Sequence, residues 1–181
     1  MNLPNKLTLL RMAVIPLFLG MFYARGVPGN YLWALVLFAL ASATDALDGH
    51  LARSRGLVTD FGKFMDPLAD KLLVMSALLG FVEVGAAPGW VAAIILAREL
   101  AVTGLRTLAA GRGVVIAADG WGKLKTVSQM LWILLVLWSL HLGGGGWLAL
   151  AARWGMWLVV VTTAGSGINY LWRNRQLLAD G

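Results

Sequence analysis

The sequence contains no cysteine and only two histidines. The absence of cysteine excludes disulfide bonds, thiol chemistry and cysteine-based zinc or iron–sulfur sites. His50 and His141 are too few for a histidine-rich metal site. Charged residues are also scarce, at 13% of the 181 residues, whereas an average soluble domain has about 25%. This charge content is too low for a soluble globule, for a disordered chain, or for binding nucleic acid by charge alone.

Apolar residues make up 59% of the chain, and the mean hydropathy is +0.75. A helix that crosses about 30 Å of hydrocarbon needs ~20 mostly apolar residues. Glycine- and proline-containing breaks separate six such runs, and the first run lacks a clear signal-peptide cleavage site. The runs are Leu7–Tyr23, Leu32–Ala52, Phe61–Val82, Trp90–Ala110, Val127–Leu142 and Trp147–Trp172. The composition predicts an all-α integral membrane protein, with six transmembrane helices in a single domain over residues 1–181.

The distribution of lysine and arginine predicts the orientation in the membrane. Along a path of six spans, 13 of the 15 basic residues fall on one side, and only Arg25 and Arg153 fall on the other. Loops rich in lysine and arginine stay on the cytoplasmic side. Both termini are therefore predicted to be cytoplasmic.

Four of the nine acidic residues lie at the facing ends of the second and third predicted helices. Asp45 and Asp48 are three residues apart and Asp66 and Asp70 are four apart, so each pair shares a helical face. Carboxylates that converge in a medium of low dielectric repel one another unless they are neutralised. Two Mg²⁺ or Mn²⁺ ions would neutralise them and would suit phosphoryl chemistry. The plainer alternative is four interfacial acids paired with nearby bases, but the helical spacing argues against it.

This pattern resembles a known family. The chain reads Asp45-x-x-Asp48-Gly49-x-x-Ala52-Arg53 and, after eight intervening residues, Gly62-x-x-x-Asp66-x-x-x-Asp70. The whole string is similar to the signature of the CDP-alcohol phosphotransferases. Shorter strings resemble the branch of that family whose acceptor is sn-glycerol 3-phosphate, and they begin at Asn2, Arg98 and Gly122.

The resemblance implies a homodimeric enzyme of the bacterial inner membrane, with its active site on the cytoplasmic side. Its reaction would transfer a phosphatidyl group from CDP-diacylglycerol to sn-glycerol 3-phosphate and release CMP. It also implies that the four aspartates hold two Mg²⁺ or Mn²⁺ ions and that Asp70 is the general base. The residues themselves leave open whether Asp70 is base, metal ligand or both. By the same resemblance the nucleotide would be bound by Gly49, Ala52, Arg53 and Gly62, although small residues also serve close helix packing.

The phosphate of the acceptor needs basic side chains of its own. Arg98 and Arg106 are eight residues apart and share a face of the fourth predicted helix, while Lys123 and Lys125 stand at the start of the fifth. Arginine binds phosphate in a bidentate manner and lysine supplies a mobile point charge. We predict that these four residues bind the acceptor phosphate. The alternatives are that Arg98 pairs with Glu99 or the aspartates, and that the lysines serve topology or contact anionic lipid.

Other functions fit parts of the sequence. The same chemistry could use inositol phosphate or phosphatidylglycerol as the acceptor, whereas the basic residues disfavour serine. A protein of a different class, a cation transporter, would use the carboxylates as a permeation site. Against a transporter, the acids gather at one membrane face and no paired broken helices are evident. The glycine-containing segment 113–125 lacks the P-loop spacing, which excludes an ATPase of that type.

Overall fold

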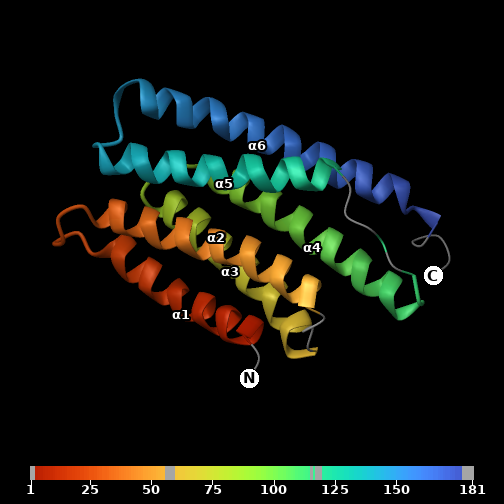
Figure 1. Ribbon diagram of the computed structural model, residues 1–181. Coiled ribbons are helices and arrows are strands. Elements are labelled where there is room, and N and C mark those ends of the chain that lie inside the picture. The colour runs from red at the N-terminus through yellow and green to blue at the C-terminus, as the bar shows by residue number, and fades with distance from the viewer. Residues whose placement is uncertain (1–2, 56–59, 115, 117–119, 177–181) are drawn as a thin grey trace.

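The computed structural model describes residues 3–55, 60–114, 116 and 120–176, with the side chains of 3–7, 45–55, 60–64 and 66 outside the description. The described residues form six α-helices and contain no strand (Figure 1). The helices are α1 Leu3–Tyr23, α2 Asn30–Arg55, α3 Asp60–Glu83, α4 Gly89–Gly111, α5 Gly120–His141 and α6 Gly146–Arg173. The prediction of an all-helical chain with six helices is confirmed.

One helix boundary was predicted wrongly. Helix α5 begins at Gly120, whereas the apolar run predicted a start at Val127; the other boundaries agree within four residues. The two lysines at positions 123 and 125 ended the apolar run in the sequence. In the structure the Lys125 side chain is only 4% exposed and bonds a carboxylate inside the bundle. A charged residue with a buried partner can continue a helix that hydropathy alone would end.

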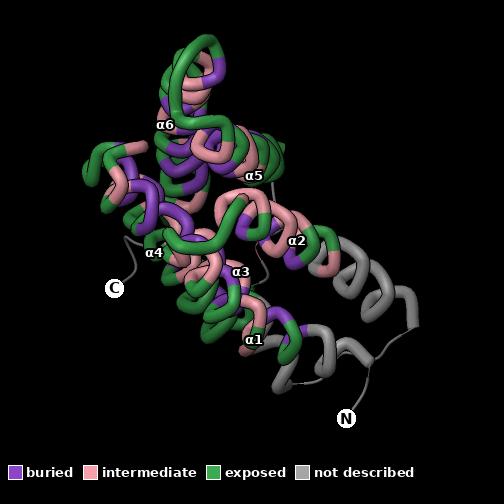
Figure 2. Tube along the Cα trace, turned by 90° about the vertical axis from the view of Figure 1, so that its left-hand side faces the viewer, coloured by how far each residue is buried: buried purple, intermediate pink, exposed green. Residues whose placement is uncertain are grey.

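The helices pack as a closed ring. Each helix packs on two neighbours, in the order α1, α2, α5, α6, α4, α3 and back to α1, and α2 also touches α3. Figure 2 shows this arrangement nearly along the helix axes, with buried residues on the inward faces. Consecutive helices run in opposite directions, so both termini lie at the same end of the bundle (Figure 1).

An aromatic core fills the opposite end. Phe22 of α1 packs against Phe81 of α3 with ring centroids 6.1 Å apart, and Phe81 meets Trp132 of α5 at 5.9 Å. Gly80 allows this approach, since a Cβ there would lie 2.8 Å from the Phe22 ring. Short connections, residues 24–29, 84–88 and 142–145, close this end. The cavity described below lies toward the other end, which carries the termini.

The outer surface carries many large apolar side chains, whose exposure to water is unfavourable. Large side chains such as Trp147, which is 75% exposed, Trp154 and Ile168 project from α6, and similar residues cover the other helices. Helices α5 and α6 are long and apolar enough to cross a membrane, while 8–23 and 30–44 are shorter apolar stretches. An apolar exterior around a helix bundle suits contact with lipid chains.

Candidate functional site

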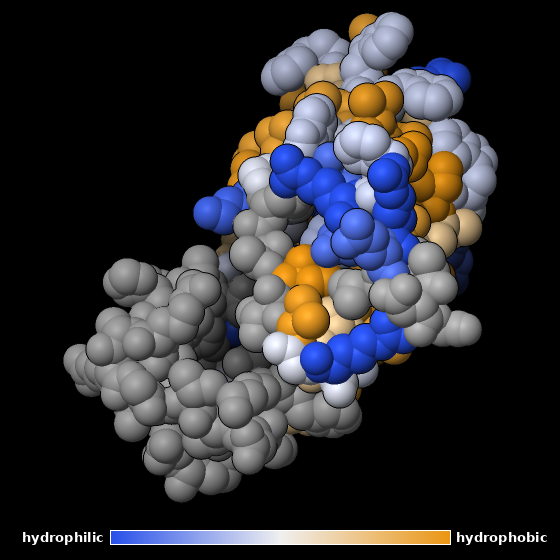
Figure 3. All heavy atoms as spheres, turned by 90° about the vertical axis from the view of Figure 1, so that its right-hand side faces the viewer, coloured by the Kyte–Doolittle hydropathy of each residue, from blue (hydrophilic) through white to orange (hydrophobic). Residues whose placement is uncertain are grey.

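A cavity of about 970 Å³ opens at the end of the bundle that carries both termini. Figure 3 looks onto this end and shows hydrophilic side chains gathered around a hollow with apolar residues inside it. Residues of α1 to α5 line the cavity. Among the described lining residues the charged ones are Arg11, Lys71, Arg98, Arg106, Lys123 and Lys125, together with Asp70 and Glu99. The excess of basic over acidic side chains makes this described part of the wall attractive to anions.

Two of the predicted basic residues meet at one carboxylate. Lys125 of α5 donates a hydrogen bond from Nζ to Glu99 Oε1, and Arg98 Nη1 of α4 donates to the same oxygen at 3.2 Å. We call these three residues the Arg98 cluster. Glu99 offsets one of its two positive charges, so the cluster keeps a net charge of +1. The alternative that Arg98 pairs with Glu99 is thus found in the structure, and Lys125 shares the same partner.

Helix α6 fixes the orientation of both arginines. Arg98 Nε donates to Ser166 Oγ at 3.0 Å, and Arg106 Nε donates to Tyr170 Oη at 2.8 Å. Both arginines line the cavity, in agreement with the prediction that their eight-residue spacing puts them on one face of this helix. Because each Nε is already bonded, each guanidinium is held in one orientation. Arg98 also donates from Nη1 to Glu99, so an anion would be bound by its remaining N–H groups and by the Nη groups of Arg106.

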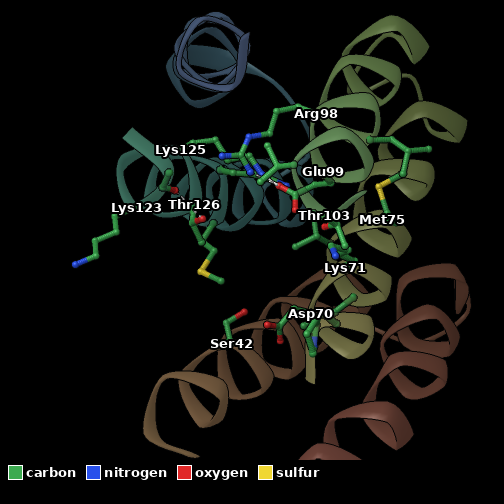
Figure 4. A pocket seen from close by; sticks show the side chains of 18 of the residues that line it. Ser42, Asp70, Lys71, Met75, Arg98, Glu99, Thr103, Lys123, Lys125 and Thr126 are labelled. Atoms are coloured by element: carbon green, nitrogen blue, oxygen red, sulfur yellow. Dashed lines mark hydrogen bonds and ion pairs between the residues drawn. The ribbon is translucent and has the colours of Figure 1, made fainter. Parts of the chain in front are cut away.

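Lys123 is placed differently from Lys125. It belongs to the lining of the cavity but is exposed. In Figure 4 its side chain extends away from the Arg98 cluster, whereas Lys125 points toward Glu99. Of the four predicted acceptor-binding residues, the structure therefore brings Arg98, Arg106 and Lys125 to one side of the cavity and leaves Lys123 at its rim.

Asp70 lies across the cavity from the Arg98 cluster (Figure 4). Arg11 Nη1 donates to Asp70 Oδ1 at 2.7 Å; the Arg11 side chain is 1% exposed and that of Asp70 is 41% exposed. The buried guanidinium therefore holds the carboxylate from behind while much of the carboxylate faces the cavity. From the sequence, Arg11 was only one of the 13 basic residues predicted to lie on the cytoplasmic side. The available signal was an arginine inside an apolar helix, which usually marks a functional site.

The other residues that were predicted to bind the metals and the nucleotide belong to α2 and α3. Their side chains lie outside the described residues, and they are Asp45, Asp48, Gly49, Ala52 and Arg53 of α2, and Gly62 and Asp66 of α3. Among the side chains that the structure does describe, no group of three or more histidine, aspartate or glutamate residues is placed to hold a metal. The metal and nucleotide sites therefore stay predictions. Both helices reach the cavity, through Ser42 of α2 and Asp70 of α3.

Comparison with known proteins gives matches along nearly the whole chain. Residues 1–165 match the CDP-alcohol phosphatidyltransferase family. A CDP-diacylglycerol–glycerol-3-phosphate 3-phosphatidyltransferase of Bacillus subtilis (strain 168) is 42% identical over 98% of this chain and 97% of the relative. A probable phosphatidylglycerophosphate synthase of Mycobacterium tuberculosis (strain CDC 1551 / Oshkosh) is 44% identical over 95% of this chain and 81% of the relative. A Haemophilus influenzae protein that carries the same name as the Bacillus relative is 36% identical over 94% of this chain and 91% of the relative.

Proposed function

Because this chain belongs to the CDP-alcohol phosphatidyltransferase family, we propose that it catalyses the reaction of phosphatidylglycerophosphate synthases. It transfers the phosphatidyl group of CDP-diacylglycerol to sn-glycerol 3-phosphate and releases CMP. The observation that carries the choice of acceptor is the net positive Arg98 cluster, joined by Arg106, across the cavity from Asp70. A donor that brings its own diphosphate does not need this second set of cations, whereas an acceptor with a phosphate dianion does.

In this proposal Asp70 acts on the acceptor hydroxyl. A primary hydroxyl is a poor nucleophile at neutral pH, and a carboxylate within hydrogen-bond reach can take its proton as attack proceeds. The hydroxyl oxygen bonds to the phosphorus of the phosphatidyl group, and the bond between that phosphorus and the CMP oxygen breaks. The proton passes to Asp70 and CMP leaves with the bonding electron pair. Arg11 keeps the carboxylate oriented toward the cavity throughout.

The aspartates of α2 and α3 suit a pair of divalent ions. Four carboxylates offer the hard oxygen ligands that Mg²⁺ and Mn²⁺ prefer, and Asp70 presents such an oxygen to the cavity. We propose that Asp45, Asp48, Asp66 and Asp70 hold two ions against the diphosphate. Bound there, the ions would offset the charge on the phosphoryl oxygens and on the departing CMP.

The remaining predicted residues bind the two substrates. Gly49, Ala52 and Gly62 leave room beside the backbone for the cytidine nucleotide, and Arg53 contacts its diphosphate. On the other side of the cavity, Arg98, Arg106 and Lys125 bind the acceptor phosphate, and Lys123 attracts it at the rim. The primary hydroxyl of the acceptor then lies between the nucleotide-binding and the phosphate-binding residues, next to Asp70.

The placement of charge along the helices supports a membrane orientation. We propose that residues 1–181 form one domain of six transmembrane helices in the bacterial inner membrane, with both termini and the active site cytoplasmic. The basic residues of the cavity and of the C-terminal end of α6 lie at the end that carries the termini, while Arg25 lies in a connection at the other end. From the family resemblance we expect a homodimer.

The test is CMP release by the purified protein in detergent micelles that contain CDP-diacylglycerol. Glycerol 3-phosphate, inositol phosphate and phosphatidylglycerol are supplied in separate reactions, with and without Mg²⁺ or Mn²⁺. We expect CMP and a new phospholipid with glycerol 3-phosphate only, and neither after chelation of the metal. Faster release with another acceptor would reassign the substrate. Cation flux into liposomes without CMP release would instead identify a transporter.

A further inference from the structure

One buried amide in the cavity wall has no partner for its oxygen. Gln129 of α5 lines the cavity and is 3% exposed, and its Oε1 has no hydrogen-bond partner among the described residues. Buried polar groups in folded proteins are nearly always hydrogen-bonded, since an unbonded one loses the bonds it made to water. An amide oxygen left unbonded at the wall of a cavity is therefore expected to accept a hydrogen bond from a ligand there.

Neighbouring polar residues make their hydrogen bonds to groups other than the Gln129 oxygen. Ser128 Oγ and Thr162 Oγ1 lie 3.1 Å apart between α5 and α6, and each also bonds a carbonyl of its own helix. This pair belongs to the packing of the two helices and does not line the cavity. The Gln129 oxygen takes no part in that network, which argues against a purely structural role for it.

The position of Gln129 relative to Lys125 indicates which ligand it meets. The two residues are four apart on α5, so they lie on the same face, about 6 Å apart along the helix axis. Helix α5 starts at the open end of the cavity, so Lys125 of the Arg98 cluster lies nearer that end and Gln129 lies one turn deeper. This distance along the helix is similar to the length of a three-carbon chain measured from its phosphate.

We propose that Gln129 binds the secondary hydroxyl of glycerol 3-phosphate and determines specificity for it. The inference rests on the proposed function, in which the phosphate lies at the Arg98 cluster and the primary hydroxyl lies near Asp70. The middle carbon of the acceptor, which bears the secondary hydroxyl, then lies along the cavity wall between the phosphate and the primary hydroxyl. An amide both donates and accepts hydrogen bonds, which matches the capacity of a hydroxyl group.

The test compares two acceptors that differ only in this hydroxyl. Propane-1,3-diol monophosphate keeps the phosphate and the primary hydroxyl but lacks the secondary one. A site that bonds a substrate hydroxyl rejects the analogue without it, because its polar group is then left unpaired. In the unsubstituted protein we expect kcat/KM to favour glycerol 3-phosphate by on the order of ten- to a hundred-fold.

In Gln129→Met, which keeps the length of the side chain and removes the amide, this preference should fall to about threefold or less, and the KM for CDP-diacylglycerol should stay within about twofold. Gln129→Leu gives a second apolar variant if the first is unstable. Ser128→Ala is the matched control, because it removes a buried polar group from the same helix but not from the cavity. It should keep the full preference.

The outcomes separate this inference from the proposed function. If the unsubstituted protein transfers to neither phosphate ester, the proposed function fails and this inference fails with it. If it uses glycerol 3-phosphate but does not discriminate, or if the Gln129 variants discriminate equally well, only the role of Gln129 is refuted. A higher KM for CDP-diacylglycerol with unchanged discrimination would place the amide on the donor instead and would also overturn the inference.

Discussion

Arg98→Ala tests whether the Arg98 cluster binds the acceptor. The substitution removes a guanidinium that is held in one orientation by Ser166 and Glu99. Glu99 and Lys125 remain bonded to each other, and together they are electrically neutral. The cluster thus loses its whole positive surplus, which is what the proposed function requires for holding a phosphate dianion.

The magnitude follows from the pre-orientation of Arg98. Because Ser166 and Glu99 already fix the side chain, little further conformational entropy is lost when phosphate binds. A charge-assisted hydrogen bond then contributes about 1.5–3 kcal/mol. This corresponds to an increase of roughly ten- to a hundred-fold in the KM for glycerol 3-phosphate. The KM for CDP-diacylglycerol should change by less than about threefold, since the donor is assigned to α2 and α3.

The assay follows tritiated glycerol 3-phosphate into chloroform-soluble product, with each substrate varied at saturation of the other. Arg153→Ala is the matched control, since Arg153 is exposed and lies outside the cavity lining. It should leave both KM values unchanged. Arg98→Lys keeps the charge but loses the planar guanidinium, so its KM for the acceptor should lie between those of the unsubstituted protein and Arg98→Ala. Thermal unfolding in detergent accompanies each variant.

Two results would refute the reasoning. An equal rise in both KM values in a protein of unchanged thermal stability would place Arg98 on the donor side. An unchanged KM for glycerol 3-phosphate would remove the Arg98 cluster from substrate binding altogether and reduce it to packing of α4 against α5 and α6.

Three further variants, one of them with a matched control, test other parts of the structure. Asp66→Asn should abolish turnover at any Mg²⁺ or Mn²⁺ concentration, because it removes a charged ligand from a shared site; recovery with excess metal would show a peripheral role. Asp70→Asn should lower kcat by about 10²–10⁴ while CDP-diacylglycerol still binds, because the other three aspartates still hold the ions; binding weakened more than about tenfold would show that Asp70 acts mainly as a metal ligand. Gly80→Ala should lower stability by about 1–3 kcal/mol, seen as a lower Tm in detergent, because its Cβ would lie 2.8 Å from the buried Phe22 ring. Gly104→Ala, where a Cβ meets nothing within 4 Å, should leave the Tm unchanged or raise it.

The sequence by itself determined the helices and the family. Hydropathy over a window of ~20 residues is a local property, so five of the six helices were located to within four residues. The aspartate signature is local in the same sense, since its spacing depends only on helical periodicity and one short connection. The eight-residue spacing of Arg98 and Arg106 likewise predicted their common face.

Only the tertiary structure decided which of these residues meet. Arg11 and Asp70 are 59 positions apart, and Glu99 and Lys125 are 26 apart. The early start of α5 was missed for the same reason, because a lysine is compatible with the inside of the bundle only when Glu99 faces it. The open amide of Gln129 is also invisible in the sequence, where it is one polar residue in an apolar run. These contacts depend on the order α1, α2, α5, α6, α4, α3 around the ring, and that order is set by the packing of side chains between helices rather than by the periodicity within any one of them.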